Sequence, residues 1–434
     1  MLHPRKRWIT ACGLAAALLA AGSAGAVDAP ADSGATTPVG VGPSWSVEAT
    51  SSYHAVQKAY FGAANRNDNW NEGFACVRLN FGSTAGAWGS AGVVGMSTLG
   101  TDYYGTHDAG DAQLDQLVAG FVNVAGSGLD VTAGRQNLVL GDGFLIGDGY
   151  RDHRAALWNI PLSYFDAVKG EWHRGPAQAL MFGANLSASF ADSGVTTKGQ
   201  VFGGEAGWNG GDAGQLVGTW LQRNDTGTSN RDATAFSLRG SWTRGTATVF
   251  GEGVLEGGTQ RATRLAGRGG HAGIKVQSAA RWTPMLKGEY FRFSGDDPAT
   301  AEDESYDPWM YRWSDWSQYY VGDLVSSTIG DASDMRIWEL QLGLKPAAAT
   351  GVRLLAHRMD LDRPQGIDVN EGTATAFAYE YDIVLEQGFG DRISAYVMGA
   401  WAQPLAAAKA GIGSANSSQV FASVTVRFGS AGGE

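Results

Sequence analysis

Charged side chains that alternate with apolar ones are the first residues in this sequence whose types and spacing could do chemistry. Arginine is the sharpest case, because its planar guanidinium can give a carboxylate two parallel hydrogen bonds. The basic residues in such stretches are Arg78, Lys169, Arg239, Lys275, Arg353 and Arg427, and the acidic ones are Glu48, Glu171, Glu205, Glu252, Glu289, Glu339, Glu380 and Asp382. Gathered on one side of a sheet, they would orient a polar solute. The alternative is that they pair across neighbouring strands and only stiffen the wall.

Motifs for catalysis and for cofactor binding are missing from the sequence or lack their context. No Gly-x-Ser-x-Gly occurs, and no histidines and cysteines have metal-ligand spacing. Gly141-x-Gly143 has no βαβ unit around it, as a nucleotide loop would need. We therefore predict no catalytic residue and no cofactor.

Two alternatives to that expectation remain open. Ca²⁺ could bind an acidic stretch without the EF-hand pattern, formed by Glu302, Asp303, Glu304 and Asp307. His107 and His153 fall in predicted outer loops, where either could serve an outer-membrane enzyme if a serine or carboxylate lay beside it.

Alternation with period two is the dominant pattern from Trp45 onward. In residues 374–386, Tyr381 and Ile383 share one side while Glu380 and Asp382 share the other, as in a strand with an apolar and a polar face. The same split gives apolar faces to Val420, Ala422, Val424, Val426 and Phe428, to Leu180, Phe182, Ala184 and Leu186, and to Phe236, Leu238 and Trp242.

Eighteen such segments can be counted between turn signals. They begin near residues 45, 73, 87, 112, 129, 164, 177, 198, 214, 232, 246, 269, 284, 335, 351, 373, 391 and 418. An even count fits a single-chain bacterial barrel. We therefore predict an all-β fold, a transmembrane antiparallel β-barrel of about eighteen strands.

The connections between these segments alternate in length. Every second one is short, at residues 82–86, 126–128, 174–176, 209–212, 244–245, 283–284, 346–350 and 388–390, whereas long polar stretches include 57–71, 141–164, 256–270, 294–334 and 404–417. Segments that arrive at the short connections finish on Phe81, Trp172, Trp208, Trp242 and Trp282, and the last finishes on Phe428. The pattern predicts short periplasmic turns with an aromatic girdle and long extracellular loops.

Composition agrees with a membrane barrel. Only 17% of the residues are charged, 63 of 434 are glycine, and the formal charge of −11 argues against a nucleic-acid partner. After residue 26 no stretch offers the roughly 18 consecutive apolar residues of a membrane helix. A soluble β-sandwich or propeller is the alternative, but no repeat of about 40 to 50 residues is visible.

The first 26 residues are typical of a secretory signal peptide. Arg5, Lys6 and Arg7 precede an apolar run, and residues 24–26 read Ala-Gly-Ala. A lipoprotein signal ending at Cys12 is a weaker alternative, because its apolar stretch would be too short. We expect residues 1–26 to be removed, 27–43 to form a disordered lead and 44–434 to form the barrel.

Two segments carry a family resemblance. One contains Gly134-Arg135-Gln136, an Asp/Gly-rich stretch over residues 141–149, and Arg151 and Arg154; the other contains Ser294-Gly295-Asp296 where a strand ends. Both resemble the alginate-export family of outer-membrane channels. The resemblance implies an eighteen-stranded barrel whose arginine-rich lumen passes an anionic polyuronate. Arg135 stands at the arginine of the family's Gly-Arg-Gln motif. Four more arginines lie in sequence stretches similar to those of the family: Arg151, Arg154, Arg353 and Arg358. The overall negative charge of this chain departs from the family pattern.

The expected function is passive transport across the bacterial outer membrane of an anionic or otherwise polar saccharide. The expected partners are that solute, outer-membrane lipid and periplasmic export components. The expected pore-lining contacts are Arg135, Arg151, Arg154, Arg78, Arg239, Arg353, Arg358 and Glu289. Among transport functions, the alternative is a less selective porin for small metabolites. Among other functions, an alternative is a structural barrel with a plugged lumen. The sequence does not decide whether residues 294–334 fold inward as a gate.

Overall fold

A computed structural model of the chain describes residues 42–62, 67–102, 105–141, 143–146, 165–186, 189–190, 195–196, 198–226, 230–307, 309, 333–364 and 374–430. The predicted signal peptide and nearly all of the predicted disordered lead lie outside these residues. The first strand begins at Gly42, two residues before the predicted start of the barrel.

Antiparallel strands make up almost all of the described chain. The wall consists of β1 (Gly42–Gln57), β2 (Asp68–Gly82), β3 (Ala87–Asp102), β4 (Gly105–Phe121), β5 (Leu129–Gln136), β6 (Phe165–Arg174), β7 (Ala177–Leu186), β10 (Lys198–Asn209), β11 (Gly214–Thr226), β12 (Arg231–Arg244), β13 (Ala247–Gln260), β15 (Arg268–Gln277), β16 (Met285–Phe293), β18 (Met335–Ala347), β19 (Thr350–Leu361), β20 (Ala376–Phe389), β21 (Ile393–Pro404) and β22 (Ser417–Gly429). The predicted starts lie within a few residues of the observed ones, except for β2 and β4, which begin five and seven residues earlier.

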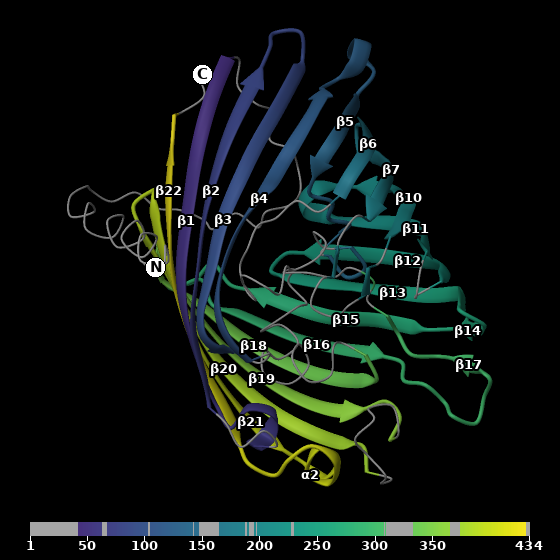
Figure 1. The fold of residues 1–434 in the computed structure, drawn as a ribbon, viewed down its shortest axis with the longest axis vertical. Coiled ribbons are helices and arrows are strands. Elements are labelled where there is room, and N and C mark those ends of the chain that lie inside the picture. Colours follow the sequence, from purple (N-terminus) through teal and green to yellow (C-terminus); the bar gives the residue numbers. More distant parts are fainter. Residues whose placement is uncertain are drawn as a thin grey trace, which may run out of the picture.

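The sheet closes on itself. Each wall strand pairs with its neighbours in the chain, and β1 pairs with both β2 and β22, so that Val47 lies opposite Val77 on one side and Phe428 on the other. In Figure 1 the colours pass once around the wall, from purple β1 to yellow β22 beside it. The sheet has twenty strands, two of which are the short β14 (Thr263–Leu265) and β17 (Glu302–Asp303); the other eighteen form the barrel. The predicted fold class is confirmed.

Short turns join the strands at one end. Gly175 and Gly245 sit in tight turns with φ of 58° and 63°, a conformation that favours glycine and matches the twist of the flanking strands. The opposite end carries the longer connections, which include α2 (Ala406–Gly411) between β21 and β22. No helix among the described residues has the length and apolar character to cross a membrane.

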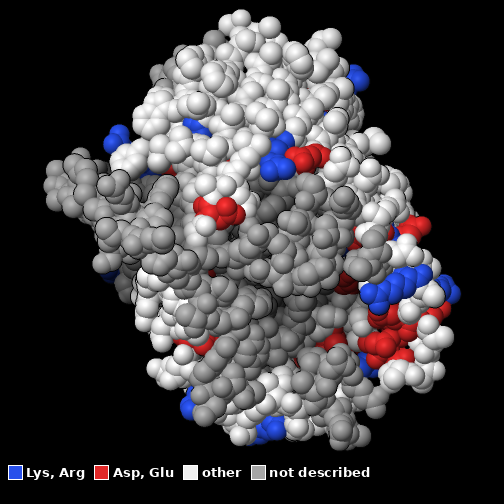
Figure 2. All heavy atoms as spheres, in the orientation of Figure 1, with Lys and Arg blue, Asp and Glu red and all other residues white. Residues whose placement is uncertain are grey.

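One predicted long loop is a hairpin arm instead. Residues 256–270 continue β13 to Gln260 and return through β14, which pairs in parallel with β17. Figure 2 shows white, mostly uncharged atoms over the upper part of the molecule, and red and blue side chains gathered at the edge where β14 and β17 lie.

The outer face of the wall is apolar. Outward side chains such as Leu238, Trp242, Leu340, Ile383 and Val420 are exposed, as expected of a surface against hydrocarbon. Phe81, Trp208, Trp242 and Trp282 are exposed near the short turns, where the sequence predicts a girdle of aromatic residues. The outer face of the barrel is thus suited to a lipid bilayer.

The face assignment of β7 is wrong. Phe182 is 6% exposed and packs with other inward residues, whereas Met181 is 73% exposed on the outer face. The cause is an apolar cluster inside the barrel near the long-loop end, which includes Phe182, Val201 and Phe291. Apolar side chains there are sheltered by protein, so an apolar face does not mark the outside of a strand.

Candidate functional site

A row of ionisable side chains crosses the inner wall from β12 to β20. Strand register sets Arg239 opposite Glu252, Glu252 opposite His271, Glu289 opposite Glu339, and Glu339 opposite His357. Because side chains alternate between the two faces of a strand, directly paired residues point to the same side. These side chains are all buried, in keeping with their place inside the barrel.

Lys287, on β16, connects the middle of this row. Its ammonium donates to Glu289 Oε2 at 2.6 Å and lies 3.0 Å from Glu339 Oε1. The other oxygen of Glu289 lies 2.7 Å from His271 Nδ1. We call these residues, together with His357 and Asp382, the inner charge chain.

His357 extends the inner charge chain across β19. Its Nε2 lies 3.5 Å from Glu339 Oε2, and its Nδ1 lies 3.5 Å from Asp382 Oδ2. The inner charge chain contains three carboxylates, one ammonium and two imidazoles, so it is acidic when the imidazoles are neutral. Buried charges are costly unless paired, and the close contacts around Lys287 provide that pairing.

Elsewhere the inward arginines bind single carboxylates. Arg78 Nε donates to Asp115 Oδ2 at 2.8 Å, and Cys76 Sγ donates to the same oxygen at 3.2 Å. Further inward pairs are Lys169 with Glu171, Arg239 with Glu205, Arg353 with Glu386 and Arg427 with Glu48. Every one of these cations therefore has a carboxylate partner in the wall.

The described residues 137–141 and 143–146 leave β5 and pack against the far inner wall. Phe144 is fully buried, with its ring 5.2 Å from that of His271 and 5.9 Å from that of Phe293. Gly141 lies so close to Arg239 that a Cβ there would be 1.5 Å from Nη1. The segment, which we call the crossing segment, therefore spans the interior from β5 to β12, β15 and β16.

The structure separates the predicted site residues into three groups. Arg78, Arg239, Arg353 and Glu289 face inward, while Arg151 and Arg154 lie outside the described residues. Arg135 and Arg358 point outward, since Arg135 pairs with exposed Leu117 and Arg358 with exposed Trp338. Arg135 forms a two-bond contact with Asp166 on that outer face. The structure therefore places Arg135 and Arg358 outside the lumen, and solute contact by the inward residues stays a prediction.

Three inward residues were missed in the sequence. His271 and Lys287 share the face of the predicted Lys275 and Glu289, so counting by twos along β15 and β16 would have found them. Asp115 was hidden by a bulge in β4, where Gly92 pairs with Gln116 and Val93 with Leu114. A bulge inserts one residue and resets the alternation, which no periodic pattern reveals.

The outer-loop alternatives fall partly outside the described residues. Arg264 holds Glu302, Arg231 holds Asp307, and no group of three His, Cys, Asp or Glu side chains within the described ranges could hold a metal ion. His153 and the side chain of His107 lie outside what the structure describes.

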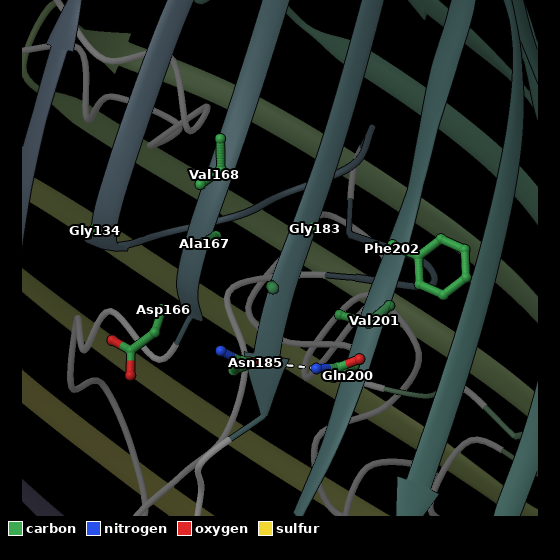
Figure 3. Close-up of a pocket in the computed structure, with 10 residues that line it drawn as sticks. Gly134, Asp166, Ala167, Val168, Gly183, Asn185, Gln200, Val201 and Phe202 are labelled. Atoms are coloured by element: carbon green, nitrogen blue, oxygen red, sulfur yellow. Dashed lines mark hydrogen bonds between the residues drawn. The ribbon is translucent and has the colours of Figure 1, made fainter.

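A small hollow of about 370 Å³ lies apart from this interior, on the outer face of β6, β7 and β10. Its wall includes Asp166, Val168, Asn185 and Phe202, and a Cβ on Gly183 would meet nothing within 4 Å. Figure 3 shows Gln200 reaching Asn185, to which it donates at 3.2 Å. The hollow arises from a missing side chain in the wall.

Comparison with known proteins identifies the fold. No family model and no curated protein sequence matches the chain. Among solved structures it is similar to the outer membrane protein OprD from Pseudomonas aeruginosa, with 11% identity, a TM-score of 0.59 and coverage of 94% of this chain and 98% of that one. It is also similar to OccAB1 from Acinetobacter baumannii, with 12% identity, a TM-score of 0.58 and coverage of 91% and 99%.

A third solved structure, OccK3 (OpdO) from Pseudomonas aeruginosa, shares 13% identity and a TM-score of 0.56, with coverage of 89% of this chain and 96% of that one. The structures that the chain resembles are thus OprD and Occ proteins. The predicted resemblance to the alginate-export family is wrong. It rested on short motifs such as Gly-Arg-Gln, whereas the solved structures that match over the whole barrel are OprD and Occ proteins.

Proposed function

We propose that this protein is a passive channel of the outer membrane for small polar metabolites, with no enzymatic activity. The observation that carries the proposal is the closed barrel with an apolar outer face and a charged inner one. Eighteen strands enclose more space than their own side chains can fill. The fold that the chain shares with the outer membrane protein OprD supports the same function.

The inner charge chain favours solutes that carry a positive charge. Its acidic residues face the interior, and the low-dielectric wall behind them focuses their field into the lumen, where it attracts a cation. The inward arginines contribute little opposing field, since each lies beside a carboxylate. We therefore propose a weak preference for cationic and zwitterionic solutes over anionic ones.

Electrical recording in planar bilayers tests the channel. Purified protein should give stepwise conductance, and a KCl gradient should give a reversal potential of the sign that denotes cation preference. Absence of conductance from folded protein would contradict the channel, whereas conductance with anion preference would contradict only the charge selectivity. Liposome swelling with neutral sugars of increasing size would then measure the size limit.

A further inference from the structure

Three arginines gather on the outer face of β16, β18 and β19, at the end of the barrel that carries the long connections. Arg292 pairs in register with Arg336, and Arg358 lies on the next strand beside Tyr379. All three side chains lie on the same face of the sheet as the exposed Trp338 and Leu340, which face the membrane. We call Arg292, Arg336 and Arg358 the outer arginine cluster.

The cluster begins where the apolar surface ends. Arg336 stands two residues beyond Trp338 on β18, and Arg292 two residues beyond Tyr290 on β16; the Tyr290 and Trp338 rings are 4.5 Å apart. Aromatic rings of this kind mark the headgroup level of a bilayer. Two residues add roughly 7 Å along a strand, which places the Arg292 and Arg336 guanidinium groups among the headgroups, with Arg358 level with Trp338 beside them.

Two aspartates partly neutralise the cluster, but they lie beneath it. Arg292 Nε and Nη2 donate to Asp362 at 3.0 and 3.2 Å, and Arg358 Nη2 donates to Asp360 at 2.7 Å. The side chains of Asp362 and Asp360 are 5% and 22% exposed, whereas those of Arg292, Arg336 and Arg358 are 61%, 38% and 33% exposed. The surface presented outward is therefore positive.

The two aspartates do not fully offset the unfavourable register of the cluster. Like charges set directly opposite each other on neighbouring strands destabilise a sheet, and Arg292 and Arg336 are such a pair. Asp362 lies 3.8 Å from Arg336 Nε, beyond hydrogen-bond range, so it does not bridge both guanidinium groups closely. A phosphate, which presents several acceptor oxygens, would bond both.

We propose that the outer arginine cluster binds the phosphate of a phosphorylated glycolipid in the outer leaflet of the membrane. The lipid chains would lie along the exposed side chains of Trp338 and Leu340, while the phosphate accepts hydrogen bonds from the guanidinium groups. This site lies on the outside of the wall and is separate from the inner charge chain, so its function does not depend on transport.

The test compares thermal unfolding in detergent with and without added bisphosphorylated lipid A. Three proteins are needed: the wild type, the triple variant R292Q/R336Q/R358Q, and the control R264Q, which removes an exposed, carboxylate-paired arginine from the β14 arm. Lipid A should raise the Tm of the wild type and of the control by several degrees. The triple variant should lose that rise and bind at least tenfold more weakly.

Two further additives separate the sources of the anion. Dephosphorylated lipid A and inorganic phosphate at the same concentration should leave the wild-type Tm unchanged. A Tm rise with inorganic phosphate alone, or an equal rise with the dephosphorylated lipid, would overturn the proposal, as would an undiminished rise in the triple variant. If the triple variant does not fold, the single substitution R292Q, at the most exposed of the three, must still weaken binding.

Discussion

At the scale of single residues, Lys287 determines how the interior carries its charge. Its ammonium is the one lysine cation within the inner charge chain and contacts Glu289 on its own strand and Glu339 on the neighbouring β18. An ion pair in such a place is weak evidence for stability, but removing one partner leaves a buried charge without compensation. The residue therefore links the stability of the wall with its selectivity.

Replacing Lys287 by Met should lower the free energy of unfolding by about 3 to 5 kcal/mol, the usual cost of breaking a buried pair. The same change should increase cation preference, because Glu289 and Glu339 lose a cation between them. Chemical unfolding and the reversal potential in a KCl gradient measure the two effects. Lys275→Met, a less buried inward lysine on β15, is the matched control. Equal stability of the two variants would contradict the role given to Lys287.

Asp334, just before β18, should make stability depend on pH. Burial raises the pKa of its carboxyl to about 7, although the backbone N–H of Arg363 donates to Oδ1 at 2.7 Å. The folded state thus holds a proton that the unfolded state releases at its ordinary pKa of 3.8. Stability contributed by this group falls as pH rises from about 4 to about 7 and then levels off.

Asp334→Asn tests this dependence, because the amide oxygen can still accept from Arg363 while the charge is removed. We expect the wild type to have a lower Tm at pH 8 than at pH 5 and the variant to show a smaller difference. Thermal unfolding at both values measures it. Identical differences in the two proteins would show that other groups set the pH dependence.

At the scale of elements, the crossing segment decides how much of the interior stays open. Phe144 anchors it by contacts with the rings of His271, Phe293 and Tyr306. Leu138, Leu140, Leu145 and Ile146 of the same segment are also buried in the apolar cluster. The position of the segment is therefore set by several buried apolar side chains, with Phe144 the largest, and by the close approach of Gly141 to Arg239.

Phe144→Ala should cost about 3 to 5 kcal/mol and loosen the packing of the crossing segment against β15 and β16. Single-channel conductance should rise, since the loosened segment fills less of the interior. Phe236→Ala, on the outer face of β12, is the control and should leave conductance unchanged. A variant that folds and conducts like the wild type would rule out the crossing segment as a constriction.

Alternation predicted the strands well because the membrane gives each face of a strand one constant environment. Tyr381, Ile383 and Leu385 face out and Glu380 and Asp382 face in, as the sequence indicates. The same rule failed for Phe182, which lies toward the long-loop end, whereas the inward placement of Arg135 and Arg358 came from the family resemblance and not from alternation. Beyond the apolar layer the outside is polar and the inside is covered by protein, so polarity no longer tells which way a side chain points.

The partners within the interior could not be predicted from the sequence either. Parity placed Glu289 and Glu339 inside, but only strand register brings them opposite each other and to Lys287. Register depends on turn geometry and on bulges such as the one at Asp115. The crossing segment was interpreted as part of an Asp/Gly-rich loop, and its apolar residues, which include Leu140 and Phe144, were not taken as a sign that it packs inside.

At the scale of the whole molecule, the two faces of the wall should respond oppositely to one added charge. Ile383 lies outward at the middle of β20, and Ser423 lies inward on β22. Ile383→Arg should destabilise the barrel in a bilayer by about 2 to 4 kcal/mol, whereas Ser423→Arg should cost less because it faces the interior. Unfolding titrations in lipid vesicles measure both, and a reversed order would contradict the assignment of the faces.

The strands around the barrel differ in length, with consequences for one margin of the wall. β4 has 17 residues and β5 has 8, so residues 105–116 of β4 pair with β3 but, within the described ranges, with no strand on their other side. A bare margin of this kind can recruit a strand from another polypeptide. Asp111 lies exposed along it, and its charge would disfavour edge-to-edge pairing with the same margin of a second copy.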